Sequence, residues 1–355
     1  MTDLTLSDSQ KKLLQELIDA RGPAGVEHEV AEICLRELTA ICDEAWLDDI
    51  GNVIGVIRAS GEPERGAVHL MAHMDEIALI VKRVYGDGQL RIVKLGGLQP
   101  MSFGQCPVDI MGDHAIVPGV MSIGSLHVTK ETAELTTTAD DHLDWDDIFI
   151  TTRLNNEQLA ERGVHAGTRV VIGRYMRRLF EFEDCIAGHF MDDRALIIVG
   201  LETMRQLAAE KEKITRDVYL VCTVKEEVTN SGALHAVNTI PGEEVVALEV
   251  GPVAAEYDTV LSDRPIVLYG DMKGFYTKDL SDRLKEAAES EGIVPQLALF
   301  ENYASDGSAV LAAGTASRAT ALCVPTQNTH GFEIIHKRAV NTAAKVLLRY
   351  LRETM

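Results

Sequence analysis

Apolar residues follow a helical pattern at the start of the chain. Within residues 13–18, four apolar side chains lie at helical intervals, and Ser7 and Gln10 precede them at capping-box spacing. Gly22 and Pro23 then end the pattern. The sequence therefore predicts an N-terminal helix that ends just before Gly22.

The segment from about residue 75 to residue 172 has a different pattern of apolar and polar residues. It contains short apolar runs ("ALIVKRV", "LRIVKLG", "HAIVPGVM", "DIFITT" and "TRVVIG") separated by Gly, Pro and Asp. One short helix is predicted, near residues 155–162. This pattern predicts a compact all-β module between two stretches of different character.

Outside this segment, helices and strands alternate. The predicted elements are helices at 27–40, 193–210, 231–238, 278–291, 306–313 and 338–353, a hairpin turning at Gly51-Asn52, and the strands "GAVHLMAH", "DVYLVCTV", "EVVALEV", "PQLALF" and "ATALCVP". The fold class is thus α/β, with a doubly wound mixed sheet. A chain of 355 residues is long for a single core. We expect a catalytic domain formed by residues 1–74 and 173–355, interrupted by the β module at 75–172.

The composition narrows the classes of function. The chain is 46% hydrophobic, and 55 acidic residues against 34 basic ones give a formal net charge of −21. Such a surface repels phosphate groups, so neither nucleic acids nor anionic membranes are expected as partners. The N-terminus lacks the features of a targeting segment, no apolar run approaches the roughly 20 residues of a membrane span, and the cysteines show no CxxC spacing. We therefore expect a cytoplasmic protein with reduced thiols.

Polar residues gather where the predicted strands end. Acidic residues or histidine end four strands, and a fifth cluster, "GHFMDDR", opens a helix. In open α/β sheets, ligands bind beyond the carboxyl ends of the strands, so these residues are expected to converge in one crevice. The set with two histidines and three carboxylates is His73, Asp192, Glu227, Glu249 and His330.

This set of residues fits a pair of divalent metal ions. Imidazole and carboxylate groups bind zinc, cobalt or manganese, and one carboxylate can bridge two ions about 3.5 to 4 Å apart. Taken singly, each residue has an ordinary explanation: a histidine at a strand end is more often structural, Asp192 could cap a helix, and Glu249 could form an ion pair. Only the joint arrangement indicates a metal site.

The motifs also resemble those of a known family. "AHMDEIALIV", "DDR", "KEEVTNSGA", "LEVGP", "SDG" and "HGFEII" occur in the order and spacing of the dinuclear metallo-aminopeptidases, peptidase family M forty-two, typified by the tetrahedral and the glutamyl aminopeptidases. The resemblance covers essentially the whole chain, including the β insertion. It implies a zinc-peptidase-like catalytic domain, with zinc favoured over cobalt or manganese.

The resemblance also implies roles for individual residues. His73 and Glu249 would complete one metal site, Glu227 and His330 the other, and Asp192 would bridge the two.

Three neighbouring features follow from the same resemblance. Glu226 would be the general base, taking a proton from a water of lowered pKa that attacks a peptide carbonyl. Asp75 would accept the second ring N–H of His73, so that the acids Asp75 and Glu76 serve the metal site. The peptide bond between Asp192 and Asp193 is expected to be cis.

Two positions depart from the family pattern. The family usually has Arg-Tyr-Met before the last histidine, where this chain has Gln327-Asn328-Thr329, so the substrate contacts of that loop are not carried over. Many members have Asp at the position of Glu249, which is one methylene longer and still able to bind a metal.

The predicted activity is removal of N-terminal residues from short peptides by a metal-dependent aminopeptidase. The nearest alternative is a carboxypeptidase or an N-acyl amino acid deacylase on the same scaffold, which a carboxylate-binding arginine in the crevice would favour. A glycosidase needs two carboxylates flanking one bond and no metal, which would leave the histidines without a role. A non-catalytic assembly protein would have no need of the predicted base and ligands.

The β insertion also suggests assembly. Its apolar segments, such as "ALIVKRV" and "VPGVMSIG", exceed what a module of roughly 100 residues needs for its own core. We expect a homo-oligomer built from dimers, and the resemblance implies a dodecamer with active sites facing an interior chamber. The alternative is that the insertion only covers the active site and leaves a monomer or dimer.

Overall fold

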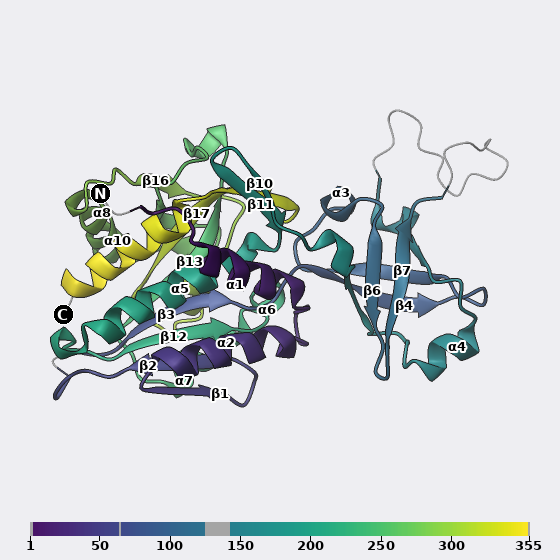
Figure 1. Ribbon diagram of the computed structural model, residues 1–355, viewed down its shortest axis with the longest axis horizontal. Helices are drawn as coiled ribbons and strands as arrows, with labels where there is room; N and C mark the ends of the chain where they lie inside the picture. Colours follow the sequence, from purple (N-terminus) through teal and green to yellow (C-terminus); the bar gives the residue numbers. More distant parts are fainter. Residues whose placement is uncertain (1–2, 64, 125–142, 354–355) are drawn as a thin grey trace.

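The protein consists of an α/β body and a β-barrel that lies beside it (Figure 1). The computed structural model describes residues 3–63, 65–124 and 143–353. The chain enters the barrel after β3 (Val68–His73) and returns to the body after β9 (Arg169–Ile172). This arrangement is compatible with the inserted all-β module. The boundaries at 75 and 172 remain a prediction.

The body is built on one mixed sheet of twelve strands. In order across the sheet, its main path comprises β1 (Glu44–Leu47), β2 (Val53–Ile57), β12 (Val218–Thr223), β3, β13 (Glu244–Pro252), β17 (Ala319–Gln327), β18 (Phe332–His336), β11 (Cys185–His189) and β10 (Phe180–Phe182). Off this path, β14 (Ile266–Asp271) pairs with β17, β15 (Gly274–Phe275) and β16 (Gln296–Leu299). The neighbours β12, β3, β13 and β17 are parallel. Their carboxyl ends therefore meet at one edge of the sheet.

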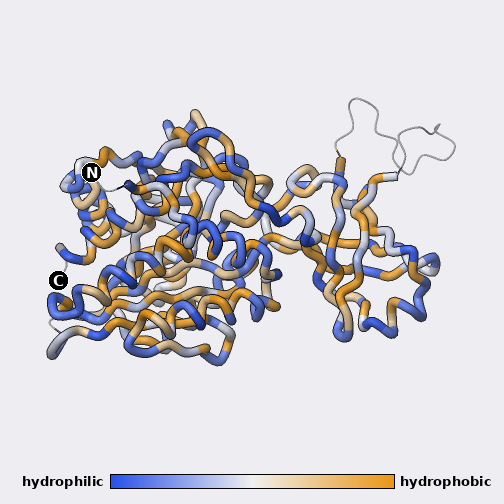
Figure 2. Tube along the Cα trace, viewed as in Figure 1, coloured by the Kyte–Doolittle hydropathy of each residue, from blue (hydrophilic) through white to orange (hydrophobic). Residues whose placement is uncertain are grey.

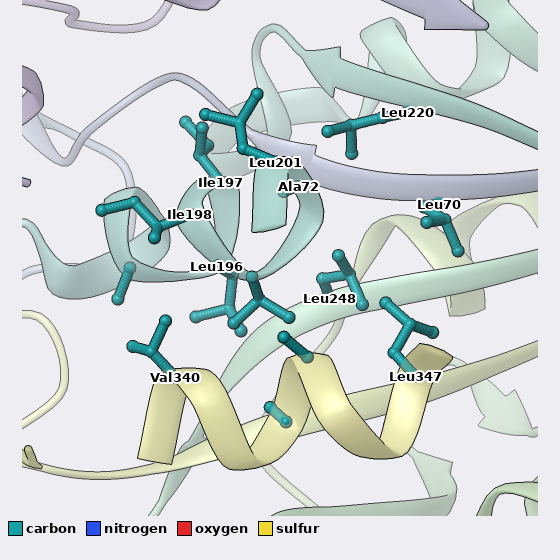
Figure 3. Packing of buried hydrophobic residues seen from close by; sticks show 14 of the residues in the cluster. Leu70, Ala72, Leu196, Ile197, Ile198, Leu201, Leu220, Leu248, Val340 and Leu347 are labelled. Carbon is teal, nitrogen blue, oxygen red and sulfur yellow. The ribbon is translucent and has the colours of Figure 1, made fainter. Parts of the chain in front are cut away.

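Helices cover both faces of this sheet. One face packs against α1 (Asp8–Asp19), α2 (His28–Ile41), α5 (Met191–Ala209), α8 (Lys278–Ser290) and α10 (Ala339–Glu353). The other packs against α7 (Ser231–Thr239) and α9 (Asp306–Ala312). Figure 3 shows side chains of α5 and α10 meeting the central strands, for example Leu196, Leu248 and Leu347. Each is at most 1% exposed, and burying one such side chain contributes about 1.5 to 3 kcal/mol.

The barrel closes on itself with six antiparallel strands. Its order is β4 (Ala78–Val84), β5 (Leu90–Leu95), β8 (Phe149–Thr151), β7 (Ile116–Ser122), β6 (Pro107–Met111) and β9. Inward residues alternate with outward ones along β7, so the barrel has a separate apolar core. Each described strand of the barrel therefore pairs with a neighbour on both sides.

The other elements in the described part of the chain are short. They are the helices α3 (Pro100–Phe103), α4 (Asn156–Glu161) and α6 (Glu226–Thr229), and 3-10 helices at Trp145–Asp147, Arg174–Met176, Lys211–Lys213 and Ala255–Tyr257. Figure 2 shows apolar residues concentrated along the buried strands and polar residues in the outer loops. Among the described residues, no helix combines the length and the apolar character needed to span a membrane.

The predicted helices and the predicted strands are confirmed. The capping box of Ser7 and Gln10 is present before α1, and α4 falls inside the range 155–162. The sequence did not predict β6, β10, β11, β14, β15 or β18.

Candidate metal centre

The parallel strands carry the first of the predicted site residues to one edge of the sheet. His73 is the last residue of β3 and lies in register with the last residue of β12. Glu249 lies in the second half of β13, and Glu226 and Glu227 open α6 directly beyond β12. These residues converge because the carboxyl ends of parallel strands share an edge.

Two other segments bring Asp192 and His330 to the same edge. Asp192 lies in the first turn of α5, which follows β11, and His330 lies in the turn between β17 and β18. The peptide bond between Asp192 and Asp193 is cis, as expected from the resemblance. Both residues have non-helical backbone angles, so the regular helix begins after them.

The Asp192 carboxylate lies at the centre of the site. Its Oδ1 is 2.8 Å from Nε2 of His73, and its Oδ2 is 3.4 Å from Nε2 of His330. Each oxygen thus faces a different histidine, which is the arrangement that a bridging carboxylate requires.

Two groups of potential ligand atoms share Asp192. The first contains His73 and Glu249, with Oε1 of Glu249 3.3 Å from Nε2 of His73. The second contains Glu227 and His330, with Oε1 of Glu227 3.6 Å from Nε2 of His330. In each group the potential ligand atoms lie within 4.8 Å of one another. Asp193 also belongs to the first group, although the sequence analysis gave it no ligand role. The structure therefore brings all the predicted ligands together.

The second ring nitrogen of each histidine has an oxygen partner. Nδ1 of His73 donates to the backbone oxygen of Asp75 at 3.1 Å, and Nδ1 of His330 donates to the backbone oxygen of Gly97 at 2.5 Å. With Nδ1 as the donor to these oxygens, Nε2 of each ring faces the Asp192 carboxylate and is the atom that would bind a cation. Gly97 follows β5, so the barrel side of the structure orients one of the two histidines.

Asp75 contacts more than the His73 ring. Its carboxylate lies 3.6 Å from Nδ1 of His73, further away than its backbone oxygen. The same carboxylate accepts the backbone N–H groups of Glu226 at 2.9 Å and Glu227 at 3.1 Å. Asp75 thereby ties the first turn of α6 to the end of β3.

Glu333 is a site residue whose role the sequence analysis did not recognise. Its carboxylate accepts the backbone N–H of Asp192 at 3.0 Å and that of His330 at 2.9 Å. Burial raises the pKa of Glu333 to about 8. The only sequence signal was an acidic residue inside the apolar run of "HGFEII".

Burial makes the carboxylates of the site reluctant to ionise. It raises the pKa of Glu227 and of Glu249 to about 7, and it raises the pKa of Glu226 well above the usual range. The cluster thus holds more acidic groups than its own imidazoles can neutralise. Divalent cations would supply the missing positive charge.

In His73, His330 and Asp192, by contrast, the surroundings favour the charged form of the side chain. Burial lowers the pKa of His330, but the neighbouring carboxylates Glu227 and Asp192 outweigh it and raise that pKa to about 11. For Asp192, burial alone would raise the pKa. Hydrogen bonds with His330 and His73 outweigh burial, so the pKa of Asp192 lies below its usual value. The nitrogen and oxygen donors of the site match those that zinc, cobalt and manganese accept.

Glu76 does not serve the metal site, and the expectation that it does is wrong. Its carboxylate pairs with Arg177 and, at 3.0 Å, with Nη2 of Arg194, and all three side chains are at most 1% exposed. Arg177 also donates to the backbone oxygens of Ile18 and Ile172 at 2.9 Å each. This buried cluster joins the segment that enters the barrel to the segment that leaves it.

A cavity of about 820 Å³ opens beside the metal-binding groups. Residues of the body and of the barrel both line it, including Glu256 and Lys273 from the body and Lys94 of β5. It is large enough for the end of a peptide.

One protein-family model matches most of the chain. The family model of "M42 glutamyl aminopeptidase" matches residues 51–346. The lysyl aminopeptidase of Pyrococcus furiosus is 28% identical over 241 residues, covering 67% of this chain and 66% of that protein, just under two thirds of its length.

Solved structures share the fold. Aminopeptidase APDkam598 from the archaeon Desulfurococcus kamchatkensis has a TM-score of 0.84 at 24% identity, covering 97% of this chain and 94% of that chain. The TET1 peptidase of Pyrococcus horikoshii, described as able to assemble into a tetrahedron or a large octahedral shell, has a TM-score of 0.80 at 23% identity, covering 95% and 98%.

Proposed function

Because the chain belongs to the M42 glutamyl aminopeptidase family, we propose that it is a metal-dependent aminopeptidase that removes N-terminal residues from peptides. One observation carries the proposal. The two oxygens of Asp192 face two different groups of nitrogen and oxygen donors, beside a cavity that can admit a peptide end.

The proposed centre holds two divalent ions in each subunit. His73 and Glu249 would bind one ion, Glu227 and His330 the other, and Asp192 both. Asp193 also lies in the first group, and its Oδ2 accepts a hydrogen bond from the backbone N–H of His73 at 2.9 Å. Zinc is the favoured ion, with cobalt and manganese as alternatives, because all three accept imidazole and carboxylate ligands.

Glu226 is the proposed general base. When bound, the two ions would lower the pKa of a water and polarise the peptide carbonyl. Glu226 accepts the proton of that water and returns it to the leaving amine. The carboxylate of Asp75 holds the backbone of Glu226 and Glu227, so it positions base and ligand together.

The lining of the cavity supports an aminopeptidase over its nearest alternative. No arginine is among the described residues that line the cavity, whereas Glu256, an acid able to face an ammonium group, does line it. A carboxypeptidase or N-acyl amino acid deacylase would need a group to bind the substrate carboxylate. Of the two lysines that line the cavity, Lys273 is engaged by Asn230, which leaves Lys94 for that role. A glycosidase, with two carboxylates about 5 to 9.5 Å apart, would leave His73 and His330 without a role.

The activity can be tested with metal-stripped enzyme and a panel of aminoacyl p-nitroanilides. We expect no hydrolysis without metal and recovery when zinc, cobalt or manganese is restored separately, since the carboxylates of the site need cations. N-acetylated versions of the same substrates serve as controls and should remain uncleaved. Release of acetate from N-acetyl amino acids, with no nitroaniline released from the aminoacyl substrates, would favour the deacylase.

We also propose a homo-oligomer built from dimers that assemble into a dodecamer. The barrel exposes apolar side chains on two of its strands, namely Val93, Ile116 and Val120, each at least 38% exposed. The assemblies described for the TET1 peptidase support the same inference.

Light scattering should give a mass near twelve times 38.9 kDa. A monomer at micromolar concentration would contradict the proposal, while a dimer would support only the pairing role of the barrel.

A cytoplasmic location is part of the proposal. All six cysteines are free thiols, and five of them are buried. Reduced thiols of this kind are typical of proteins in a reducing compartment.

A further inference from the structure

We propose that Asn230 is a positioning residue that fixes the carboxylate of Glu226 in the orientation needed to receive a proton. The inference rests on the proposed role of Glu226 as general base. It concerns a residue outside both metal-binding groups, at the junction of α6 and α7.

The side chain of Asn230 makes three polar contacts. Its Nδ2 donates to Oε1 of Glu226 at 2.6 Å and to Oδ1 of Asp306 at 3.1 Å. Its Oδ1 accepts from Nζ of Lys273 at 2.5 Å. Asn230 is 5% exposed, so most of its side chain is covered by protein.

Charge fixes the orientation of this amide. The NH₂ group faces two carboxylate oxygens, and the amide oxygen faces an ammonium group. A flipped amide would place its oxygen against the carboxylates of Glu226 and Asp306 and its NH₂ group against Lys273. Each of the three contacts would then join two acceptors or two donors, so only one orientation is stable.

The partners of Asn230 are themselves anchored. The second oxygen of Asp306 accepts the hydroxyl of Thr223, the last residue of β12, at 2.6 Å. Lys273 lies in the turn between β14 and β15, where its backbone N–H donates to Asp271 at 2.9 Å. The amide is therefore held between the end of β12 and the turn that joins β14 to β15.

This arrangement leaves one oxygen of Glu226 available. Oε1 is engaged by Asn230, while Oε2 accepts no hydrogen bond from the residues that the structure describes. Glu226 also lines the cavity. Oε2 is thus the atom that can take the proton. Without the amide, Glu226 could rotate, and no donor would stand between its carboxylate and that of Asp306.

The backbone of Asn230 guides the choice of variants. Asn230 has a φ of 52° and a ψ of 23°, in the left-handed region that glycine, asparagine and aspartate tolerate best. Asn230→Gly removes the amide without straining the backbone. Asn230→Asp keeps the shape but replaces the donor with a third carboxylate.

We expect Asn230→Gly to lower kcat about tenfold to a hundredfold, with KM changed less than about threefold, because a misoriented base slows the reaction without weakening substrate binding. Asn230→Asp should lower kcat at least as much. Both variants should bind as many metal ions as the wild type. Arg153→Gly, at an exposed left-handed position of φ 60° in the barrel, is the matched control and should keep wild-type kcat.

A double-mutant comparison separates positioning from a general structural effect. In a Glu226→Gln background, Asn230→Gly should change the residual kcat by less than about twofold, because there is no base left to orient. Wild-type kcat in either Asn230 variant, loss of metal ions, or an equal fall in both backgrounds would overturn the inference. If Glu226→Gln itself kept wild-type kcat, the proposed base would be wrong, and the inference would fall with it.

Discussion

Replacing Glu226 with glutamine is expected to lower kcat at least about a hundredfold, the low end of the contribution of a general base. Glutamine nearly preserves the shape of the side chain but cannot take a proton. Glu226 belongs to neither group of potential metal ligands. The variant should therefore retain its metal ions, which elemental analysis of the purified protein can measure beside the kinetics.

Glu227→Gln is the informative neighbour for comparison. Its side chain belongs to the second group of potential ligands, with Asp192 and His330. If the account is right, this change affects metal binding, whereas the change at Glu226 does not. Loss of metal from Glu226→Gln would instead make Glu226 a ligand and refute its role as the base.

Removing the carboxylate of Glu76 is expected to lower the free energy of unfolding by about 3 to 5 kcal/mol, the usual cost of breaking a buried ion pair from one side. Glu76→Ala would leave the guanidinium groups of Arg177 and Arg194 without their acidic partner in the interior. Denaturant unfolding of the wild type and the variant at one protein concentration measures the change.

An exposed pair provides the matched control. Lys285 and Glu289 form an ion pair along one face of α8, with side chains 35% and 45% exposed. Glu289→Ala should therefore cost less than about 0.5 kcal/mol. A cost below about 1 kcal/mol for Glu76→Ala would mean that water or another residue satisfies the two guanidinium groups, and it would contradict the stabilising role of the cluster.

The convergence of the site residues could be predicted because it depends on strand order alone. His73 and Glu249 come at or near the ends of continuous apolar runs, which predict strands. Parallel strands bring the residues at their carboxyl ends to one edge of the sheet. His330 and Asp192 lie in a turn and at a helix start, and the same pattern placed them at this edge, but their separate roles came from the resemblance. The geometry now places one oxygen of Asp192 toward each histidine.

Several strands could not be predicted because they lack a continuous apolar run. β6 reads "PVDIM", in which Pro107 and Asp109 interrupt the pattern. β10 has three residues, all exposed, and lies at the end of the sheet. Such strands are fixed by pairing with neighbours that are distant in sequence, which a local pattern does not contain.

The hydrogen-bond and ion-pair partners of the buried acids were harder to predict than the place of the site residues in the fold. Asp75 and Glu76 are adjacent in sequence, yet one carboxylate caps the first turn of α6 and the other faces Arg177, 101 residues away. Both are fully buried, and a buried charge needs a partner, but the sequence does not say which one. Glu333 and Asn230 show the same limit, since their roles follow from contacts that only the fold creates.

The central claim is that Asp192 joins two metal ions in one site. The most direct test is the number of divalent ions bound per chain, measured by elemental analysis after zinc is restored to stripped wild type and to Asp192→Ala. The account predicts about two ions per chain in the wild type and fewer than about one in the variant, because both groups lose a shared ligand. A wild type with one ion or none, or a variant that keeps two, would contradict it.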